Sequence, residues 1–137
     1  TGLLVSHAFD ENELAEENLY KQILHDKLSI NEGMIFENAI AQCLVANGYR
    51  LFFYTQYNTE KKRNDIEIDF LISNGSKTKQ KIFPIEVKSG TRYTTTSLDN
   101  FVQKYHSRIG QAYIIHTKNL CIKGEVLCIP SYMTMCL

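Results

Sequence analysis

The sequence predicts an α/β protein in which a central mixed sheet is flanked by helices. Stretches with apolar residues at helical spacing alternate with short stretches rich in β-branched and aromatic residues. In the first half, two strand-like stretches flank an Asn-Gly turn signal, which indicates an antiparallel hairpin. In the second half, a helical stretch between strands indicates a crossover connection. The 137 residues suffice for one domain with a hydrophobic core, and we take residues 1–137 as a single domain.

Two helices are expected in the first third of the chain. Asp10 can cap the first helix, and leucines and isoleucines follow it at roughly helical spacing as far as Leu28. The second helix is expected to begin near Asn31 or Glu32. It should end before Gly48, because glycine is favoured directly after a helix.

Three strands are expected next, separated by polar segments. Arg50–Tyr57 is short and aromatic, which is typical of a strand, and the charged segment Asn58–Asn64 indicates a loop. Asp65–Ser73 alternates, so that one face of the strand should carry Ile66, Ile68, Phe70 and Ile72. After the turn signal Asn74–Gly75, Ile82–Lys88 should form the third strand.

The remainder of the chain is expected to hold one helix and further strands. Ser97 can cap a helix that runs to about His106. Gln111–His116 and Leu120–Ile129 have the composition of strands. Pro130 then begins a terminal segment in which a proline in the first turn is compatible with a helix.

The overall charge does not indicate a nucleic-acid-binding protein, because fifteen basic residues balance fifteen acidic ones. Between Lys61 and Arg92, however, eight bases stand against four acids. Lys61, Lys62, Arg63 and Arg92 are therefore candidates for contacts with a phosphate backbone. A solvated basic face explains the same residues, and charge alone favours that reading.

The four cysteines form no metal-binding motif, and they predict free thiols in a reducing compartment, the cytoplasm. There is no run of about 18 apolar residues and no signal peptide, so we expect no membrane span. The chain begins with an apolar stretch and no initiator Met, which suggests a fragment of a longer protein.

The strand Ile82–Lys88 carries the most specific chemical pattern. Side chains alternate along a strand, so Glu86 and Lys88 share the face opposite to the apolar side chains, about 7 Å apart. The apolar composition indicates a central strand, where charges are unfavourable unless they are paired or functional. A salt bridge on an edge strand is the alternative explanation.

Asp69 should lie beside Glu86 if the second and third strands pair. Two adjacent carboxylates repel each other, so one pKa should rise, and a divalent cation would relieve the repulsion. Carboxylate ligands suit Mg²⁺ or Mn²⁺, and the backbone carbonyl of Val87 could provide another oxygen. Lys88 could then orient or deprotonate a water molecule, or stabilise charge on a phosphate.

Glu37 is expected to join this cluster from the second helix. It shares a helical face with Ile40, Ala41 and Leu44, at spacings of three, four and seven residues. Its carboxylate should therefore point toward the sheet. It could be a further metal ligand, directly or through water. The alternatives are an exposed acid of the helix or a structural partner of Lys88.

Four blocks in this order resemble the restriction-endonuclease-like PD-(D/E)xK superfamily, and most closely the C-terminal domain of a family of prokaryotic AAA+ ATPases. The blocks are Gly33-Met34-Ile35-Phe36-Glu37-Asn38, Glu67-Ile68-Asp69-Phe70, Glu86-Val87-Lys88-Ser89-Gly90 and Ser97-Leu98-Asp99-Asn100-Phe101. The resemblance covers nearly the whole chain. Two features depart from it: Ile68 stands where the motif's proline would precede Asp69, and no Gln-x-x-x-Tyr motif follows, because Ser107 is four residues after Gln103.

The resemblance implies a restriction-endonuclease-like fold. It leaves open which of two functions the domain has. In the first, the domain is a Mg²⁺- or Mn²⁺-dependent endonuclease-type hydrolase acting on DNA, with Asp69 and Glu86 as metal ligands, Lys88 as catalytic cation and Glu37 assisting. In the second, a catalytically silent module binds a partner or nucleic acid. The resemblance also implies an AAA+ module elsewhere in the same chain, and any ATP would bind there because this sequence has no P-loop.

Overall fold

The computed structural model describes residues 32–60, 62–73 and 81–137. Within these residues the main elements are α3 (Glu32–Ala46), β1 (Phe52–Asn58), β2 (Arg63–Ser73), β3 (Ile82–Lys88), α4 (Thr96–Tyr105), β4 (Ala112–His116), β5 (Cys121–Lys123) and β6 (Val126–Pro130). Two 3₁₀ helices, η1 (His106–Arg108) and η2 (Ser131–Cys136), follow α4 and β6. The expected first helix after Asp10 and the turn signal Asn74–Gly75 lie outside the described residues.

Most expected elements are confirmed, with two corrections. The expected strand Leu120–Ile129 is two antiparallel strands, β5 and β6, joined by a turn in which Gly124 has a positive φ of 59°. The segment Asn58–Asn64 was expected to be a loop, but the ladder continues to the pairs Tyr57–Asn64 and Asn58–Arg63. Asn58 Nδ2 also donates to Asp65 Oδ2 at 2.6 Å, which ties the two strands together through their side chains. Polar residues form this end of the ribbon because much of it faces solvent.

The described strands form one mixed sheet in the order β1-β2-β3-β4-β6-β5. β1, β2 and β3 are antiparallel neighbours, whereas β3 pairs with β4, and β4 with β6, in parallel. The parallel β3–β4 pair confirms the expected crossover through α4. Parallel strands need such a connection, because a tight turn cannot join them.

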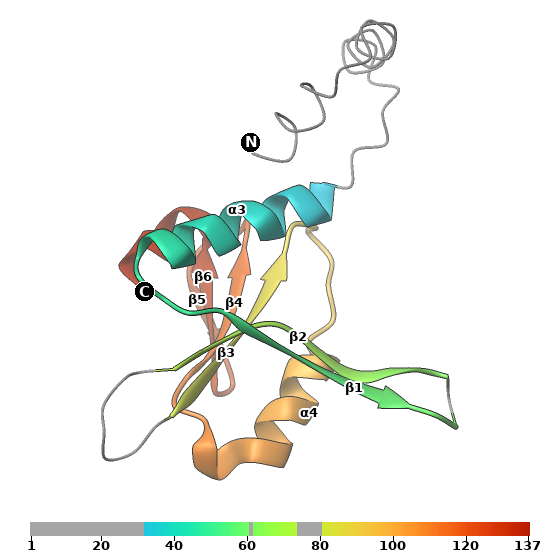
Figure 1. The fold of residues 1–137 in the computed structure, drawn as a ribbon. Coiled ribbons are helices and arrows are strands. Elements are labelled where there is room, and N and C mark those ends of the chain that lie inside the picture. The colour runs from blue at the N-terminus through green and yellow to red at the C-terminus, as the bar shows by residue number, and fades with distance from the viewer. Residues whose placement is uncertain (1–31, 61, 74–80) are drawn as a thin grey trace, which may run out of the picture.

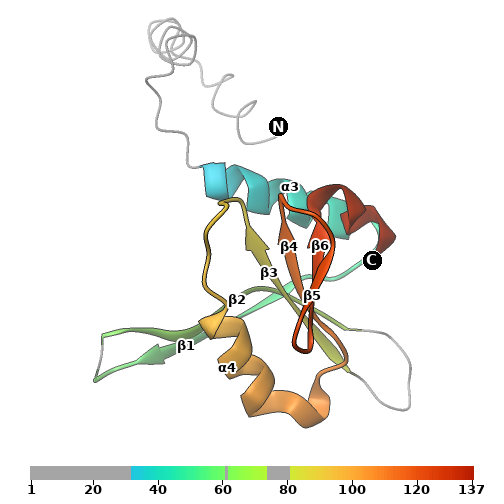
Figure 2. The same cartoon turned by 180° about the vertical axis from the view of Figure 1, so that it is seen from behind.

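The two helices cover opposite faces of the sheet (Figures 1 and 2). Leu98 and Phe101 of α4 pack in a core cluster with Ile114 on one face. Ile40 and Leu44 of α3 pack in a second cluster on the other face. This arrangement is a three-layer α/β fold with a mixed sheet at its centre, as the sequence predicts at the level of fold class.

A β-bulge changes the side-chain pattern of β2. Phe52 pairs with Leu71 and Tyr54 with Ile68, so one residue of β1, Phe53, lies opposite two residues of β2, Asp69 and Phe70. Ile68 consequently packs on the α4 side, whereas Phe70 packs on the α3 side. Ile66 lies on the same side as Ile68, and Ile72 on the same side as Phe70, so the expectation that all four share one face is wrong. The extra residue of a bulge interrupts the alternation, and bulges often occur beside active sites.

All four cysteines carry free thiols, as the sequence predicts. Cys121 and Cys128 face each other across the β5–β6 pair. Burial raises the pKa of the Cys128 thiol to about 11, so that it stays protonated at neutral pH. None of the described helices is long and apolar enough to cross a membrane.

Candidate active site

The candidate site lies where β2 and β3 separate within the sheet. Their ladder runs from the pair Ser73–Ile82 to the pair Phe70–Ile85 and extends no further. Beyond it, β2 continues beside β1, and β3 continues beside β4. Figure 1 shows β1 and β2 turning away from β3. The end of the ladder leaves backbone groups of both strands available to side chains, and Asp69 and Glu86 are the next residues on the two strands.

Asp69 fills part of this gap with its carboxylate. Its Oδ2 accepts a hydrogen bond from the backbone N–H of Val87 at 2.7 Å, in place of a backbone acceptor of β2. Burial raises the pKa of Asp69, while the Val87 N–H and the nearby charge of Lys88 act in the opposite direction. The expected pairing of the second and third strands is confirmed, and it places Asp69 and Glu86 directly beyond the last pair, Phe70–Ile85. The charge of Asp69 also raises the pKa of Glu86.

Glu86 is buried on the central strand β3, where it is only 4% exposed. Its Oε1 accepts a hydrogen bond from Lys88 Nζ at 2.7 Å in an ion pair. Its other oxygen, Oε2, is buried and has no hydrogen-bond partner within the described residues. Burial raises the pKa of Glu86, against the lowering effect of Lys88. An edge-strand salt bridge does not describe this pair, since β3 lies between β2 and β4.

Glu37 faces the same cluster from α3. Burial raises its pKa first, followed by the charges of Asp69 and Glu67, whereas Lys88 lowers it. The helical face predicted for it is confirmed, because Ile40 and Leu44 on the same stripe are buried against the sheet. Lys88 is thus the cation that acts on all three carboxyl groups, those of Glu37, Asp69 and Glu86.

The donor set fits a hard divalent cation in its chemistry. Carboxylates with raised pKa values gather around one ammonium group, and Glu86 Oε2 lacks a partner. In the described geometry, however, Lys88 Nζ donates to Glu86 Oε1, and the Val87 N–H donates to Asp69 Oδ2. Among the described residues, no group of three or more His, Cys, Asp or Glu side chains is arranged to hold a metal ion. A bound cation would therefore compete with the Lys88 ammonium for Glu86.

The basic residues suggested for contacts with a phosphate backbone belong to different segments of the chain. Lys61 lies outside the described residues. Lys62, which has a positive φ of 48°, and Arg63 lie at the end of the β1–β2 ribbon, which projects away from the rest of the sheet (Figure 1). Arg92 is exposed in the loop that follows Lys88. Lys62 and Arg63 therefore belong to the ribbon, whereas Arg92 belongs to the loop between β3 and α4.

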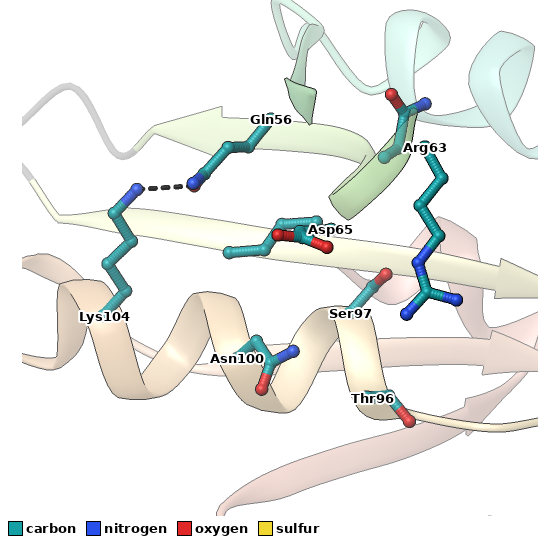
Figure 3. A pocket seen from close by; sticks show the side chains of 9 residues that line it. Gln56, Arg63, Asp65, Thr96, Ser97, Asn100 and Lys104 are labelled. Atoms are coloured by element: carbon teal, nitrogen blue, oxygen red, sulfur yellow. Dashed lines mark hydrogen bonds between the residues drawn. The ribbon is translucent and has the colours of Figure 1, made fainter. Parts of the chain in front are cut away.

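A separate hollow of about 540 Å³ lies between β2 and α4. Figure 3 shows Arg63 at one end and Lys104 at the other, with Asp65 and Asn100 between them. Lys104 Nζ donates to Gln56 Oε1 at 2.6 Å, so its charge is already engaged. We refer to Glu37, Asp69, Glu86 and Lys88 as the acid cluster. None of these four residues lines the hollow, so we do not assign the hollow to the chemistry of the acid cluster.

Sequence reasoning did not include Glu67, Tyr93 and His116 in the site. The charge of Glu67 raises the pKa of Asp69 and of Glu37. Glu67 is two residues before Asp69 in a predicted strand, and that spacing could have identified it. His116 ends the predicted strand Gln111–His116 and is the register partner of Lys88, so its position at a strand end was the available signal. Tyr93 had no such signal, because its hydrogen bond to His116 depends on the tertiary fold.

Replacing Asp69 by asparagine is expected to stabilise the fold at neutral pH by about 0.5–2 kcal/mol. The pKa of Asp69 is raised in the folded state, so ionisation weakens the fold as pH rises above the ordinary value of 3.8. Asparagine removes that charge and can still accept the Val87 N–H. Urea unfolding near neutral pH and near pH 3.8 should show a difference that shrinks on acidification.

The exposed Glu60 provides a control for the loss of one negative charge, and Glu60→Gln should leave the stability unchanged. A lower stability of Asp69→Asn at neutral pH would contradict this reading. It would mean that the Asp69 charge stabilises the sheet.

Of the comparisons with known proteins, one matches most of the described residues. No curated protein and no solved structure was found to match the chain. The family described as a domain of unknown function, DUF4143, matches residues 32–132, which include the acid cluster and all strands of the described sheet. Since this match covers most of the sequence, the protein belongs to the DUF4143 family.

Proposed function

We propose that the domain is a metal-dependent phosphodiesterase that acts on DNA and has a restriction-endonuclease-like fold. The observation that carries the proposal is the buried Glu86, whose Oε2 has no partner in the described residues, next to Lys88 and Asp69 at the point where β2 and β3 separate. Buried carboxylates with raised pKa values weaken a fold and are common at functional sites.

The roles follow from the position of each group. Asp69, Glu86 and the Val87 carbonyl would hold Mg²⁺ or Mn²⁺, with Glu37 assisting directly or through water. When bound, the cation supplies positive charge and Lewis acidity next to a phosphate. Lys88, released from Glu86, would place its ammonium against the charge that develops on the phosphate oxygens. The Val87 N–H holds the Asp69 carboxylate in the gap.

We further propose that the domain is the C-terminal part of a prokaryotic AAA+ ATPase, with ATP bound in another part of the protein. The support is the order of the four sequence blocks, each of which falls on a distinct element. The blocks containing Glu37, Asp69, Lys88 and Phe101 lie on α3, β2, β3 and α4.

A second candidate function is a catalytically silent module that binds a partner or nucleic acid. It is favoured by the Lys88–Glu86 ion pair at 2.7 Å, which neutralises the central carboxylate within the chain itself. A structural ion pair of this kind needs no metal. The two functions differ in whether a divalent cation can take the place of Lys88 at Glu86.

The test is nicking of supercoiled plasmid by the wild type and by Asp69→Asn, in Mg²⁺, in Mn²⁺ and in EDTA. We expect cleavage with either cation, none in EDTA, and a loss of about 100-fold or more in the variant, because it lacks a ligand charge. Equal cleavage by both proteins would indicate a contaminating nuclease. No cleavage by the wild type would favour the silent module.

A further inference from the structure

A second group of charged and aromatic residues lies on the α4 face of the sheet, outside the acid cluster. Lys118 Nζ is 5.5 Å and Lys123 Nζ is 4.7 Å from the centre of the Tyr93 ring. Lys123 Nζ also donates a long hydrogen bond of 3.5 Å to the Tyr93 hydroxyl. We refer to Tyr93, Lys118 and Lys123 as the Tyr93 surface.

The Tyr93 surface holds two positive charges without a negative partner. Among the described residues neither lysine forms an ion pair with a carboxylate, and both side chains are exposed. The face of an aromatic ring attracts each ammonium but does not neutralise it. An anion bound between the two lysines would relieve their repulsion.

Lys104 makes similar ring contacts but differs from Lys118 and Lys123 in its hydrogen bonding. Its Nζ is 5.0 Å from the centre of the Tyr105 ring and 5.9 Å from that of Tyr54. It also donates to Gln56 Oε1 at 2.6 Å, which satisfies the ammonium within the protein. Neither Lys118 nor Lys123 has a hydrogen bond this short in the described part of the chain.

Tyr93 is held in place by a buried histidine. Its hydroxyl lies 2.8 Å from Nδ1 of His116, and Nε2 of His116 lies 3.1 Å from the carbonyl oxygen of Asn119. A carbonyl only accepts, so Nε2 donates to it, and in the neutral ring Nδ1 then accepts from the Tyr93 hydroxyl. His116 is 1% exposed, so this anchor is built into the core.

The same histidine places the Tyr93 surface next to Lys88. His116 and Lys88 are register partners in the parallel β3–β4 pair, and each is the last residue of its strand. Figure 2 looks onto the face that carries α4, and Tyr93 and Cys121 of β5 pack against the core cluster on this face of the sheet. Ligands of α/β sheets bind beyond the carboxyl ends of the parallel strands, where Lys88 and His116 lie and Lys118 follows. Lys123 belongs to β5, and its ammonium reaches the Tyr93 ring from there.

We propose that the Tyr93 surface binds the phosphodiester backbone of a nucleic-acid strand and holds it alongside Lys88. Lysines act as point charges on phosphates and contact the backbone without reading the sequence. This inference rests on the proposed function, because it names how the same site would hold its substrate. It assigns strand binding to the residues near Lys88 in place of the basic end of the β1–β2 ribbon.

The test is the binding of a fluorescein-labelled DNA of about 20 nucleotides, single-stranded and duplex, measured by anisotropy in EDTA so that nothing is cut. We expect the double variant Lys118→Ala/Lys123→Ala to raise the Kd by about tenfold or more at moderate salt. The slope of log K against log salt should fall by about 1.4 for the single strand and about 1.8 for the duplex, since two phosphate contacts are lost.

The matched control is Lys104→Ala/Arg108→Ala, which removes two exposed charges near a tyrosine ring at the other end of α4. It should change the Kd by less than about twofold and leave the salt slope unaltered. The proposal would be overturned if both double variants had equal effects, or if Lys118→Ala/Lys123→Ala bound DNA as the wild type does. It would also be overturned if polyglutamate displaced the DNA at equal charge concentration, or if the wild type did not bind DNA. Binding without cleavage would contradict only the phosphodiesterase.

Discussion

Replacing Lys88 by methionine is expected to lower metal-dependent plasmid nicking by about 100-fold or more. The change removes the ammonium that acts on Glu37, Asp69 and Glu86. Methionine retains most of the apolar stem of lysine, so the packing around β3 should persist. Initial rates at saturating Mn²⁺ provide the measurement.

The same replacement should weaken the fold in a pH-dependent way. Burial already raises the pKa of Glu86 above its ordinary 4.5, and Lys88 opposes this shift, so the pKa rises further without it. When the pKa of a carboxyl group is raised in the folded state, the protein loses stability as pH rises from the unfolded-state pKa of that group through its folded-state pKa. Compared with the wild type, Lys88→Met should therefore lose about 1–3 kcal/mol at about pH 8, and less near pH 4.5.

A double variant tests the stability effect of Lys88. Lys88→Met/Glu86→Gln has no buried charge left without a partner, so it should regain most of the stability while remaining inactive. Full nicking activity in Lys88→Met would contradict the catalytic role of the ammonium. Urea unfolding of Lys88→Met gives its folded fraction under the assay conditions, and a loss of activity no larger than the unfolded fraction would also contradict that role.

Replacing Ile114 by alanine is expected to destabilise the protein by about 2–5 kcal/mol. Ile114 is 0% exposed, packs in the core cluster beneath α4, and is the register partner of Glu86. Truncation would leave a cavity beside the strand that carries the acid cluster. Urea unfolding followed by circular dichroism measures the effect.

Ile122→Ala is the matched control, since this isoleucine lies in the same sheet but is 74% exposed. Its stability should stay within about 0.5 kcal/mol of the wild type. Similar losses from the two substitutions would show that β4 does not lie in the core of the sheet. The position of Glu86 would then have to be revised.

The central strand and its charged pair could be predicted because the local pattern and the tertiary role agree. Glu86 and Lys88 alternate with Ile85 and Val87 in this apolar stretch, so one observation determines both the strand and the face of Glu86 and Lys88. Glu37 followed from helical spacing for the same reason.

The bulge in β2 could not be predicted from the sequence, because nothing in the composition around Asp69 distinguishes a bulged strand from a regular one. The ribbon end Asn58–Arg63 was missed for a related reason. A strand segment with two polar faces has no alternation that would separate it from a loop.

The Tyr93–His116 contact lies beyond sequence reasoning as well. The residues are 23 positions apart, and they meet because α4 brings β4 back beside β3. Each residue type alone is typical of a core. The functional reading depends on the lysines that the fold gathers around the ring.

The most direct test of the central claim is a calorimetric titration of Mg²⁺ and Mn²⁺ into the wild type and into Asp69→Asn. If Glu86, Asp69 and Glu37 form a cation site, the wild type should bind at millimolar concentration or below, and the variant should bind much more weakly. Binding should also raise the Tm of the wild type, since a ligand specific for the folded state stabilises it. Absence of binding by either ion, with identical behaviour of the two proteins, would show that the acid cluster is a structural ion pair and not a metal centre.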